Sequence, residues 1–276
     1  MRVRFLLPLL LASLLALAGA NAWADAAEDL RRGEEAFNLG QYESAMTWYR
    51  KAAEQGSAEA EFKLGLAYSE GTGVPQDFAQ AFEWYRKAAE QGHARAQNNL
   101  AYAYDHGEGV ARDPAQAVAW YRKAAEQGEL YAQRELAADY ANGDGVAADP
   151  AQAAFWARKA AERGDLQSQI MIAMAYASGK GVPQDFKQSA EWYRKAAEQG
   201  DGFAAASLGF QYAQGQGVQK NIGDAYMWFA IALARGYADA QQYRLKFQKE
   251  IGQSELDAAE QRAKDWLDDF QKRKGG

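Results

Sequence analysis

The chain has 276 residues, and 48% of them are hydrophobic, so it can bury a large core. Its 31 basic and 37 acidic side chains give a net charge of −6, which repels nucleic acid and anionic lipid headgroups and argues against either as a partner. The absence of cysteine excludes disulfide bonds, thiolate zinc sites and cysteine nucleophiles.

The N-terminal residues 1–24 have the order and length of a secretory signal peptide. The basic start MRVR precedes an apolar run, and small residues follow it, ending in Ala22-Trp23-Ala24. We therefore expect cleavage near Ala24, with Ala20 as the second choice, and a periplasmic or secreted protein. A membrane anchor is the alternative, but the apolar run is short for a bilayer span.

A nine-residue segment, WYRKAAEQG, recurs unchanged from Trp48, Trp84, Trp120 and Trp192, and looser copies begin at Trp156 and Trp228. From Trp84 onward the spacing is 36 residues, and the loop motif Gly-x-Gly-Val recurs in the same register. A fixed period of this length predicts a solenoid. Six copies of one segment suit a stack of similar helices better than a catalytic site.

Each period predicts two helices. The first carries Ala60, Leu64 and Tyr68 on one face and ends at Gly71, where a left-handed cap suits glycine. The second buries a stripe that includes Trp84 and Tyr85. It should begin after an N-cap side chain that accepts a hydrogen bond from the first turn. These predicted caps are Asp77, Asp113, Asp149, Asp185 and Asn221. Packing does not require the Arg, Lys, Glu and Gln of WYRKAAEQG to be identical, so recent duplication is the simpler explanation of their identity, and a functional role is the alternative.

The whole pattern, A-x3-L-G/A-x2-Y-x2-G-x-G-V-x2-D-x3-A-x2-W-Y-x-K-A-A-x2-G, resembles the Sel-one-like repeat (SLR) family, a relative of the tetratricopeptide repeats. The resemblance implies an all-α fold, a right-handed α-solenoid of stacked antiparallel helix pairs. It covers residues 57–236 as five repeats. Residues 25–56 are similar to an ordinary tetratricopeptide helix pair, because the Gly-x-Gly-Val loop is absent there.

Residues 237–276 are predicted to be capping helices and a basic tail. Ser254 and Asp257 resemble a capping box, and an apolar stripe that runs from Leu256 to Phe270 could cover the end of the stack. An open-ended solenoid requires such a terminal cap for solubility.

The sequence contains no recognisable catalytic, cofactor-binding or metal-binding constellation. The two histidines, His93 and His106, lie apart from any carboxylate cluster at ligand spacing, so we interpret both as surface residues. The Gly-x-Gly-Val loops lack the remaining residues of a nucleotide-binding motif and are interpreted as turns. SLR proteins linked to β-lactam hydrolysis carry a cysteine pair in each repeat, and this chain has none. We therefore expect a protein without enzymatic activity and without a cofactor.

A partner-binding face is predicted on the first helices, which line the concave face in tetratricopeptide-type stacks. The positions opposite the core stripe vary most between repeats, and they mix apolar with polar side chains, as contact surfaces do. Packing of several of these side chains against neighbouring first helices is the alternative. The predicted face comprises Glu59, Phe62, Leu66, Arg95, Asn98, Tyr102, His106, Tyr131, Arg134, Ile170, Met174, Phe203 and Phe210.

These features favour a non-enzymatic scaffold or adaptor of the bacterial cell envelope that binds a protein or peptide segment in the concave groove. One alternative is a peptidoglycan- or carbohydrate-binding module that stacks sugar rings on the groove aromatics. A β-lactamase-like hydrolase is a third possibility, which the absence of cysteine and of a catalytic constellation disfavours.

Overall fold

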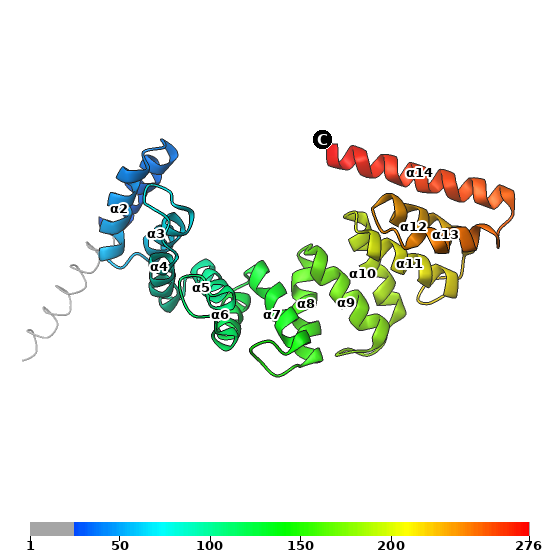
Figure 1. Cartoon of the computed structure of the whole chain (residues 1–276), viewed down its shortest axis with the longest axis horizontal. Helices are drawn as coiled ribbons and strands as arrows, with labels where there is room; N and C mark the ends of the chain where they lie inside the picture. Colours follow the sequence, from blue (N-terminus) through cyan, green and yellow to red (C-terminus); the bar gives the residue numbers. More distant parts are fainter. Residues whose placement is uncertain (1–24, 276) are drawn as a thin grey trace, which may run out of the picture. The chain divides into compact units, whose positions relative to one another are not determined.

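The computed structural model describes residues 25–275, and every regular element within that range is a helix (Figure 1). The predicted signal peptide lies outside the described residues. The helices form two compact units that divide within α7: unit 1 contains the described residues up to Ala132, and unit 2 contains those from Gln133.

Unit 1 begins with a helix over 25–38. The helices that follow in it are α2 (Tyr42–Glu54), α3 (Ala58–Glu70), α4 (Phe78–Glu90), α5 (Ala94–His106) and α6 (Pro114–Glu126). Helix α7 (Leu130–Asn142) starts in unit 1 and ends in unit 2. The remaining helices of unit 2 are α8 (Pro150–Glu162), α9 (Leu166–Ser178), α10 (Phe186–Glu198), α11 (Gly202–Gln214), α12 (Ile222–Ala234), α13 (Ala240–Gln248) and α14 (Gln253–Gly275).

Helices that are consecutive in the chain pack against each other within each unit. In unit 1, α4 contacts both α3 and α5, and in unit 2, α10 contacts both α9 and α11 (Figure 1). Within a unit, a second helix such as α4 or α10 therefore packs against the first helix of its own pair and that of the next pair. The predicted pairing of helices is confirmed, and it follows from the short loops between them.

The predicted helix boundaries are also confirmed. Helix α3 ends at Gly71, whose φ of 75° is the left-handed conformation that glycine adopts at little cost. Helix α4 begins after Asp77, whose side chain accepts a hydrogen bond from the amide of Gln80 at 3.0 Å. The other four predicted caps accept equivalent bonds: Asp113, Asp149, Asp185 and Asn221.

Within each unit, the core lies between the two helices of a pair and the first helix of the next pair. The same position of each first helix carries a fully buried leucine or isoleucine: Leu64, Leu100, Leu136, Ile172 and Leu208. The second helices contribute buried alanines and, in most repeats, a buried aromatic ring such as Tyr85. Trp48, Trp84 and Trp120 are only half-buried, so the tryptophans of unit 1 supply less of the core than the sequence pattern suggests.

Several of the repeated polar residues of WYRKAAEQG make the same contacts in more than one repeat, which gives them a structural role whatever the origin of their identity. The lysine ammonium lies over the tryptophan ring three residues earlier, as Lys123 does 3.6 Å from the centroid of Trp120. The arginines at positions 50, 158 and 194 donate to the tyrosine hydroxyl of the following first helix, as Arg194 does to Tyr212 at 3.0 Å, whereas Arg86 donates to Glu83 and Glu90.

The glutamine of the motif joins neighbouring repeats. The Gln127 side-chain amide donates to the carbonyl of Gly92 at 3.0 Å and to Oε1 of Gln97 at 2.7 Å. In unit 2, Gln199 makes the same two bonds, to the carbonyl of Gly164 and to Oε1 of Gln169. The glutamine that recurs in the motif therefore forms hydrogen bonds between consecutive repeats.

The C-terminal helices cover the last repeat, as the apolar stripe predicts. Leu256, Ala259, Ala263 and Phe270 of α14 are buried, and Trp266 contacts Trp228 of α12 with ring centroids 5.9 Å apart. The predicted capping box is wrong, because α14 already begins at Gln253 and Ser254 lies inside it. The amide of Gln253 instead donates to Asp257 at 2.7 Å.

Candidate partner-binding site

All 13 residues of the predicted partner-binding face lie on first helices. In unit 1 they come from α3, α5 and the start of α7, and in unit 2 from α7, α9 and α11. Four of them are exposed: Arg95, His106, Met174 and Phe203. Eight others are half-buried: Glu59, Leu66, Asn98, Tyr102, Tyr131, Arg134, Ile170 and Phe210.

Phe62 is the exception, and its prediction as an open groove residue is wrong. Its side chain is 1% exposed, and its ring stacks on the His93 imidazole with centroids 4.6 Å apart. The ring of Tyr85 also packs against Phe62, with centroids 6.1 Å apart. The guanidinium of Arg95 lies 4.9 Å from the centroid of the Phe62 ring. Residues from the next helix pair thus cover Phe62, which counting positions along α3 alone could not show.

His93 is a structural residue rather than a surface one, because its side chain is only 14% exposed. Its Nδ1 accepts a hydrogen bond from the amide of Ala96 at 3.1 Å, which makes it the N-cap of α5. Its Nε2 lies 2.9 Å from Oε2 of Glu59. Burial acts to raise the pKa of Glu59, but the His93 hydrogen bond and the nearby Lys63 ammonium outweigh it and lower that pKa. Glu59 is therefore committed to contacts inside unit 1.

An aromatic cluster in unit 1 joins three predicted residues. Tyr102 stacks on His106 with ring centroids 4.0 Å apart, and it meets Tyr131 edge to face at 6.2 Å. Beside it, between α3, α4 and α5, lies a pocket of about 210 Å³ lined by Leu66, Tyr102 and eight other residues. The cluster leaves little of the Tyr102 ring open to a ligand, since His106 covers one face.

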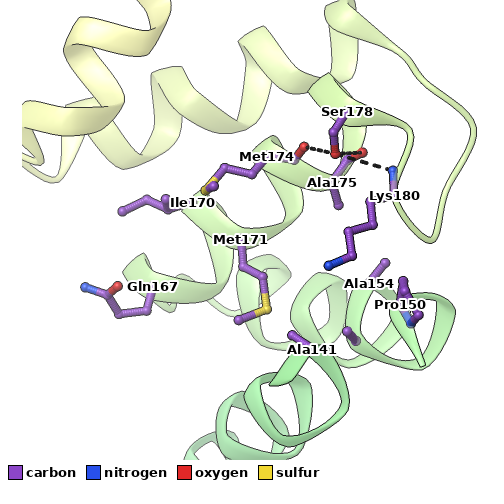
Figure 2. Close-up of a pocket in the computed structure, with 11 residues that line it drawn as sticks. Ala141, Pro150, Ala154, Gln167, Ile170, Met171, Met174, Ala175, Ser178 and Lys180 are labelled. Atoms are coloured by element: carbon purple, nitrogen blue, oxygen red, sulfur yellow. Dashed lines mark hydrogen bonds between the residues drawn. The ribbon is translucent and has the colours of Figure 1, made fainter. Parts of the chain in front are cut away.

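Unit 2 contains a larger, apolar pocket, which we call the α9 pocket. Its volume is about 440 Å³, and it lies between α7, α8 and α9 (Figure 2). It is lined by Ala141, Pro150, Ala153, Ala154, Gln167, Ile170, Met171, Met174, Ala175, Ser178 and Lys180. Small side chains on α8 leave the space, and longer side chains on α9 border it. Met174 is 49% exposed, so the pocket is accessible from solvent.

Few polar groups reach this pocket. The Ser178 hydroxyl is engaged by its own helix, donating to the carbonyl of Met174 at 2.8 Å. The side chain of Lys180 extends from the loop after α9 toward Met171 (Figure 2). Within the part of the chain that the structure describes, Lys180 forms no ion pair. The site therefore combines an apolar cavity with one positive charge, a combination that suits binding rather than catalysis.

The partner-binding face predicted from the sequence includes Ile170 and Met174 of this pocket. It does not include Met171, Lys180 or the α8 wall, which is formed by Pro150, Ala153 and Ala154. The prediction considered one face of the first helices, whereas the pocket also uses the preceding second helix and the following loop. One signal was present in the sequence, since WARKAAERG replaces WYRKAAEQG in this repeat.

Among the described residues, two kinds of site are absent, a metal site and a membrane-spanning helix. No group of three or more His, Asp or Glu side chains between residues 25 and 275 is placed to hold a metal ion. In the same range, no helix combines the length and apolar character needed to cross a bilayer. Burial raises the pKa of Tyr85 and Tyr193, and that of Tyr49 to about 12, as expected for core tyrosines.

Comparisons with known proteins identify the repeats. The family described as "Sel1 repeat" matches residues 36–57, 58–93, 94–129, 130–165, 166–201 and 202–237. No curated protein matches the chain.

Two solved structures are similar over most of the chain. One is a protective antigen of uropathogenic Escherichia coli with an SLR fold, which is 36% identical over 95% of this chain with a TM-score of 0.73. The chain spans only 55% of the length of that antigen. The other is a Sel1 repeat protein from Oxalobacter formigenes, 35% identical over 75% of this chain and 85% of its own length, with a TM-score of 0.68.

Proposed function

Because the chain belongs to the Sel1 repeat family, we propose that it is a non-enzymatic scaffold of the cell envelope that binds a protein or peptide segment on its first helices. The repeats form a frame whose contacts recur from pair to pair, and the exposed positions of the first helices differ between repeats. A frame of this kind can present a surface for a partner without catalytic residues. The envelope location rests on the signal-peptide pattern of residues 1–24.

The α9 pocket is the observation that carries this proposal. It is apolar, it opens beside the half-exposed Met174, and it lies on the helix face where partner binding is predicted. Exposed apolar surface bordered by polar groups is typical of contact sites, because covering it removes apolar area from water. We therefore place the main contact of a protein partner at Ile170 and Met174.

The glycan-binding alternative requires open aromatic faces on the same helices. Phe62 is buried, and the ring of Phe210 is packed between Phe229 and Tyr243 at centroid distances of 4.9 and 4.5 Å. One face of Tyr102 is covered by His106. These contacts leave Phe203 as the exposed aromatic ring of the predicted face, and one open ring supports a protein partner over a row of sugar rings.

Site-specific crosslinking tests the proposal in the intact cell envelope. A photo-crosslinking amino acid is placed at Met174 in one variant and at Phe155 in another, because both side chains are 49% exposed but Phe155 lies outside the pocket. We expect a discrete protein adduct at position 174 and none at position 155, identified by mass spectrometry. Retention on purified cell wall without any protein adduct would instead support the glycan alternative.

The identified protein is then purified and titrated against wild type, Met174→Ser and Phe155→Ser. We expect Met174→Ser to weaken binding at least about fivefold, because truncating a central contact side chain costs more than about 1 kcal/mol. Phe155→Ser should bind as wild type does. Equal affinity of all three proteins would contradict the assignment of this face.

A further inference from the structure

The α9 pocket and the smaller pocket of unit 1 occupy the same place in the repeat. Two periods of 36 residues separate Ala81 from Ala153 and Tyr102 from Met174, and each of these residues lines its own pocket. The same offset relates Phe78 to Pro150, Phe82 to Ala154 and Glu108 to Lys180. Both pockets therefore lie between one helix pair and the first helix of the next. Their volumes are about 210 and 440 Å³, so the α9 pocket is twice as large.

One aromatic ring that lines the unit 1 pocket, that of Tyr85, has no counterpart in the repeat that forms the α9 pocket. Position 157 is alanine, and its equivalents in the other repeats are all aromatic and buried: Tyr49, Tyr85, Tyr121, Tyr193 and Phe229. In unit 1 the ring of Tyr85 itself lines the pocket. Ala157 has no ring to fill the corresponding space, and the change from Phe82 to Ala154 removes a second one.

The polar partners of the missing hydroxyl have changed as well. The side chains of Ser69 and Asn99 act to lower the pKa of the Tyr85 hydroxyl, and Ser207, which is equivalent to Asn99, acts in the same way on Tyr193, so these polar groups face the two hydroxyls. In the α9 pocket these two positions are Ala141 and Met171. The repeat has thus lost both the phenol and the groups that bind its hydroxyl, which leaves an apolar wall. Unfilled apolar space costs stability, so a ligand that fills it gains the corresponding free energy.

The charge beside the pocket is also specific to this repeat. Lys180 stands where the other repeats have Thr72, Glu108, Asp144 or Gln216, so it is the only cation at this position. Its side chain points toward Met171 (Figure 2), and it forms no ion pair with any residue between 25 and 275. A carboxylate beside an occupant of the pocket would find this ammonium without displacing another acid.

We infer that the α9 pocket receives the aromatic side chain of a partner peptide, in place of the ring absent at Ala157, and that Lys180 binds a carboxylate next to that aromatic residue. This inference rests on the proposed function and names the chemistry of the partner. A cavity of about 150 Å³ already admits benzene, so 440 Å³ accommodates a phenyl or phenol ring with its flanking backbone. The aromatic ring of the partner thus takes the place of the ring that the other repeats supply from their own second helix, such as that of Tyr85.

Methionine-methyl NMR tests the inference with defined probes. The full chain is labelled with ¹³C at its methionine methyl groups and titrated with N-acetyl-L-phenylalanine, which joins a phenyl ring to a carboxylate. N-acetyl-L-phenylalaninamide lacks the charge, and N-acetyl-L-alanine lacks the ring. We expect the Met171 and Met174 signals to shift and to saturate in the millimolar range, which is typical of a small ligand in one open pocket. The Met46 and Met227 signals, outside the pocket, should not move.

Two variants separate the ring from the charge. Ala157→Tyr with Met171→Asn rebuilds the arrangement of Tyr85 and Asn99 and should abolish the Met174 shift while the helical content and melting temperature match or exceed those of wild type. Lys180→Gln should remove only the preference for the acid over the amide, which we expect to be about two- to fivefold in wild type because an exposed ion pair is weak.

The outcomes distinguish this inference from the proposed function. No shift of Met171 or Met174, an equal response to the alanine probe, or binding that persists in the filled variant would each overturn the inference. Loss of self-association in the filled variant, measured by sedimentation, would assign the pocket to a second copy of this chain instead. If the probes bind as expected but position 174 crosslinks to no protein, the aromatic site stands and the proposed scaffold function fails.

Discussion

At the scale of single residues, the glutamine that recurs in the motif forms hydrogen bonds that join consecutive repeats. The Gln199 amide donates to the Gly164 carbonyl at 3.0 Å and to Gln169 at 2.8 Å, and Gln169 in turn donates to the Ala161 carbonyl at 3.3 Å. Gln169 is buried, so these bonds satisfy groups that water cannot reach. In the last repeat Arg235 takes the place of glutamine and donates to the Gly200 carbonyl at 3.1 Å. The chemistry that matters at this position is therefore a long side-chain donor.

Replacing Gln199 by alanine should lower the free energy of unfolding by about 1–3 kcal/mol, because two acceptors lose their donor and one of them is buried. Gln261→Ala is the matched control, since its amide bonds only the exposed Asp265 on the same helix, and it should change stability by less than about 0.5 kcal/mol. Urea denaturation measures both variants. Equal stability of the two variants would show that the bonds between repeats contribute nothing.

At the scale of elements, the Gly-x-Gly-Val loops do more than reverse the chain. In four of these loops the second glycine lies against the first turn of the preceding second helix: Gly73, Gly109, Gly181 and Gly217. A Cβ at Gly181 would stand 2.0 Å from the carbonyl oxygen of Pro150, and one at Gly217 would stand 2.0 Å from that of Phe186. These loops therefore hold consecutive pairs in register, although the motif was interpreted only as a turn.

Gly181→Ala should destabilise the protein well beyond the cost of its positive φ alone. The backbone at Gly181 has a φ of 81°, and Gly164, with a φ of 94°, serves as the control because a Cβ there meets nothing within 4 Å. Gly164→Ala should cost about 1–2 kcal/mol, the penalty of left-handed backbone for an L-residue. Gly181→Ala should cost at least about 2 kcal/mol more, since a backbone contact must also open. Equal melting temperatures for the two variants would contradict the proposed role of the loop in packing.

At the scale of the whole molecule, each repeat depends on its neighbour for part of its core. The last repeat obtains this cover from the C-terminal helices. Ile231, which replaces the usual lysine of the motif, is fully buried, and the guanidinium of Arg235 lies 4.3 Å from the ring centroid of Phe270. Tyr226 donates its hydroxyl to Glu260 at 2.8 Å. Helix α14 thus replaces the contacts that a further repeat would make.

Deleting residues 253–276 should lower the melting temperature and expose an apolar surface around Trp228 and Ile231. The physical reason is that α14 buries four of its own side chains against this end of unit 2. Deleting only residues 272–276 is the control, because Lys272, Arg273 and Lys274 are exposed. Thermal denaturation followed by circular dichroism and the fluorescence of a hydrophobic dye measure the two proteins. Identical behaviour would mean that α14 is dispensable for closing the unit.

The candidate site could be predicted only in part. Variation on the first helices identified Ile170 and Met174, which do border the α9 pocket, but the same reasoning included Phe62, which the next pair buries. The position of a residue along one helix gives the direction in which its side chain points. It does not show which residues of a neighbouring helix pack against that side chain. Lys180 and the α8 wall join the site because the chain brings a loop and two helices together there.

The sequence by itself determined the period, the helix boundaries, the N-caps and the membership of a repeat family, because these depend on neighbours within about one turn of the chain and on spacing. The packing of the helices sets three further features: which polar side chains join repeats, which groove residues are covered, and where the absence of a ring leaves a cavity. Those features arise from residues some 20 to 36 positions apart, whose approach depends on how helices pack rather than on local pattern.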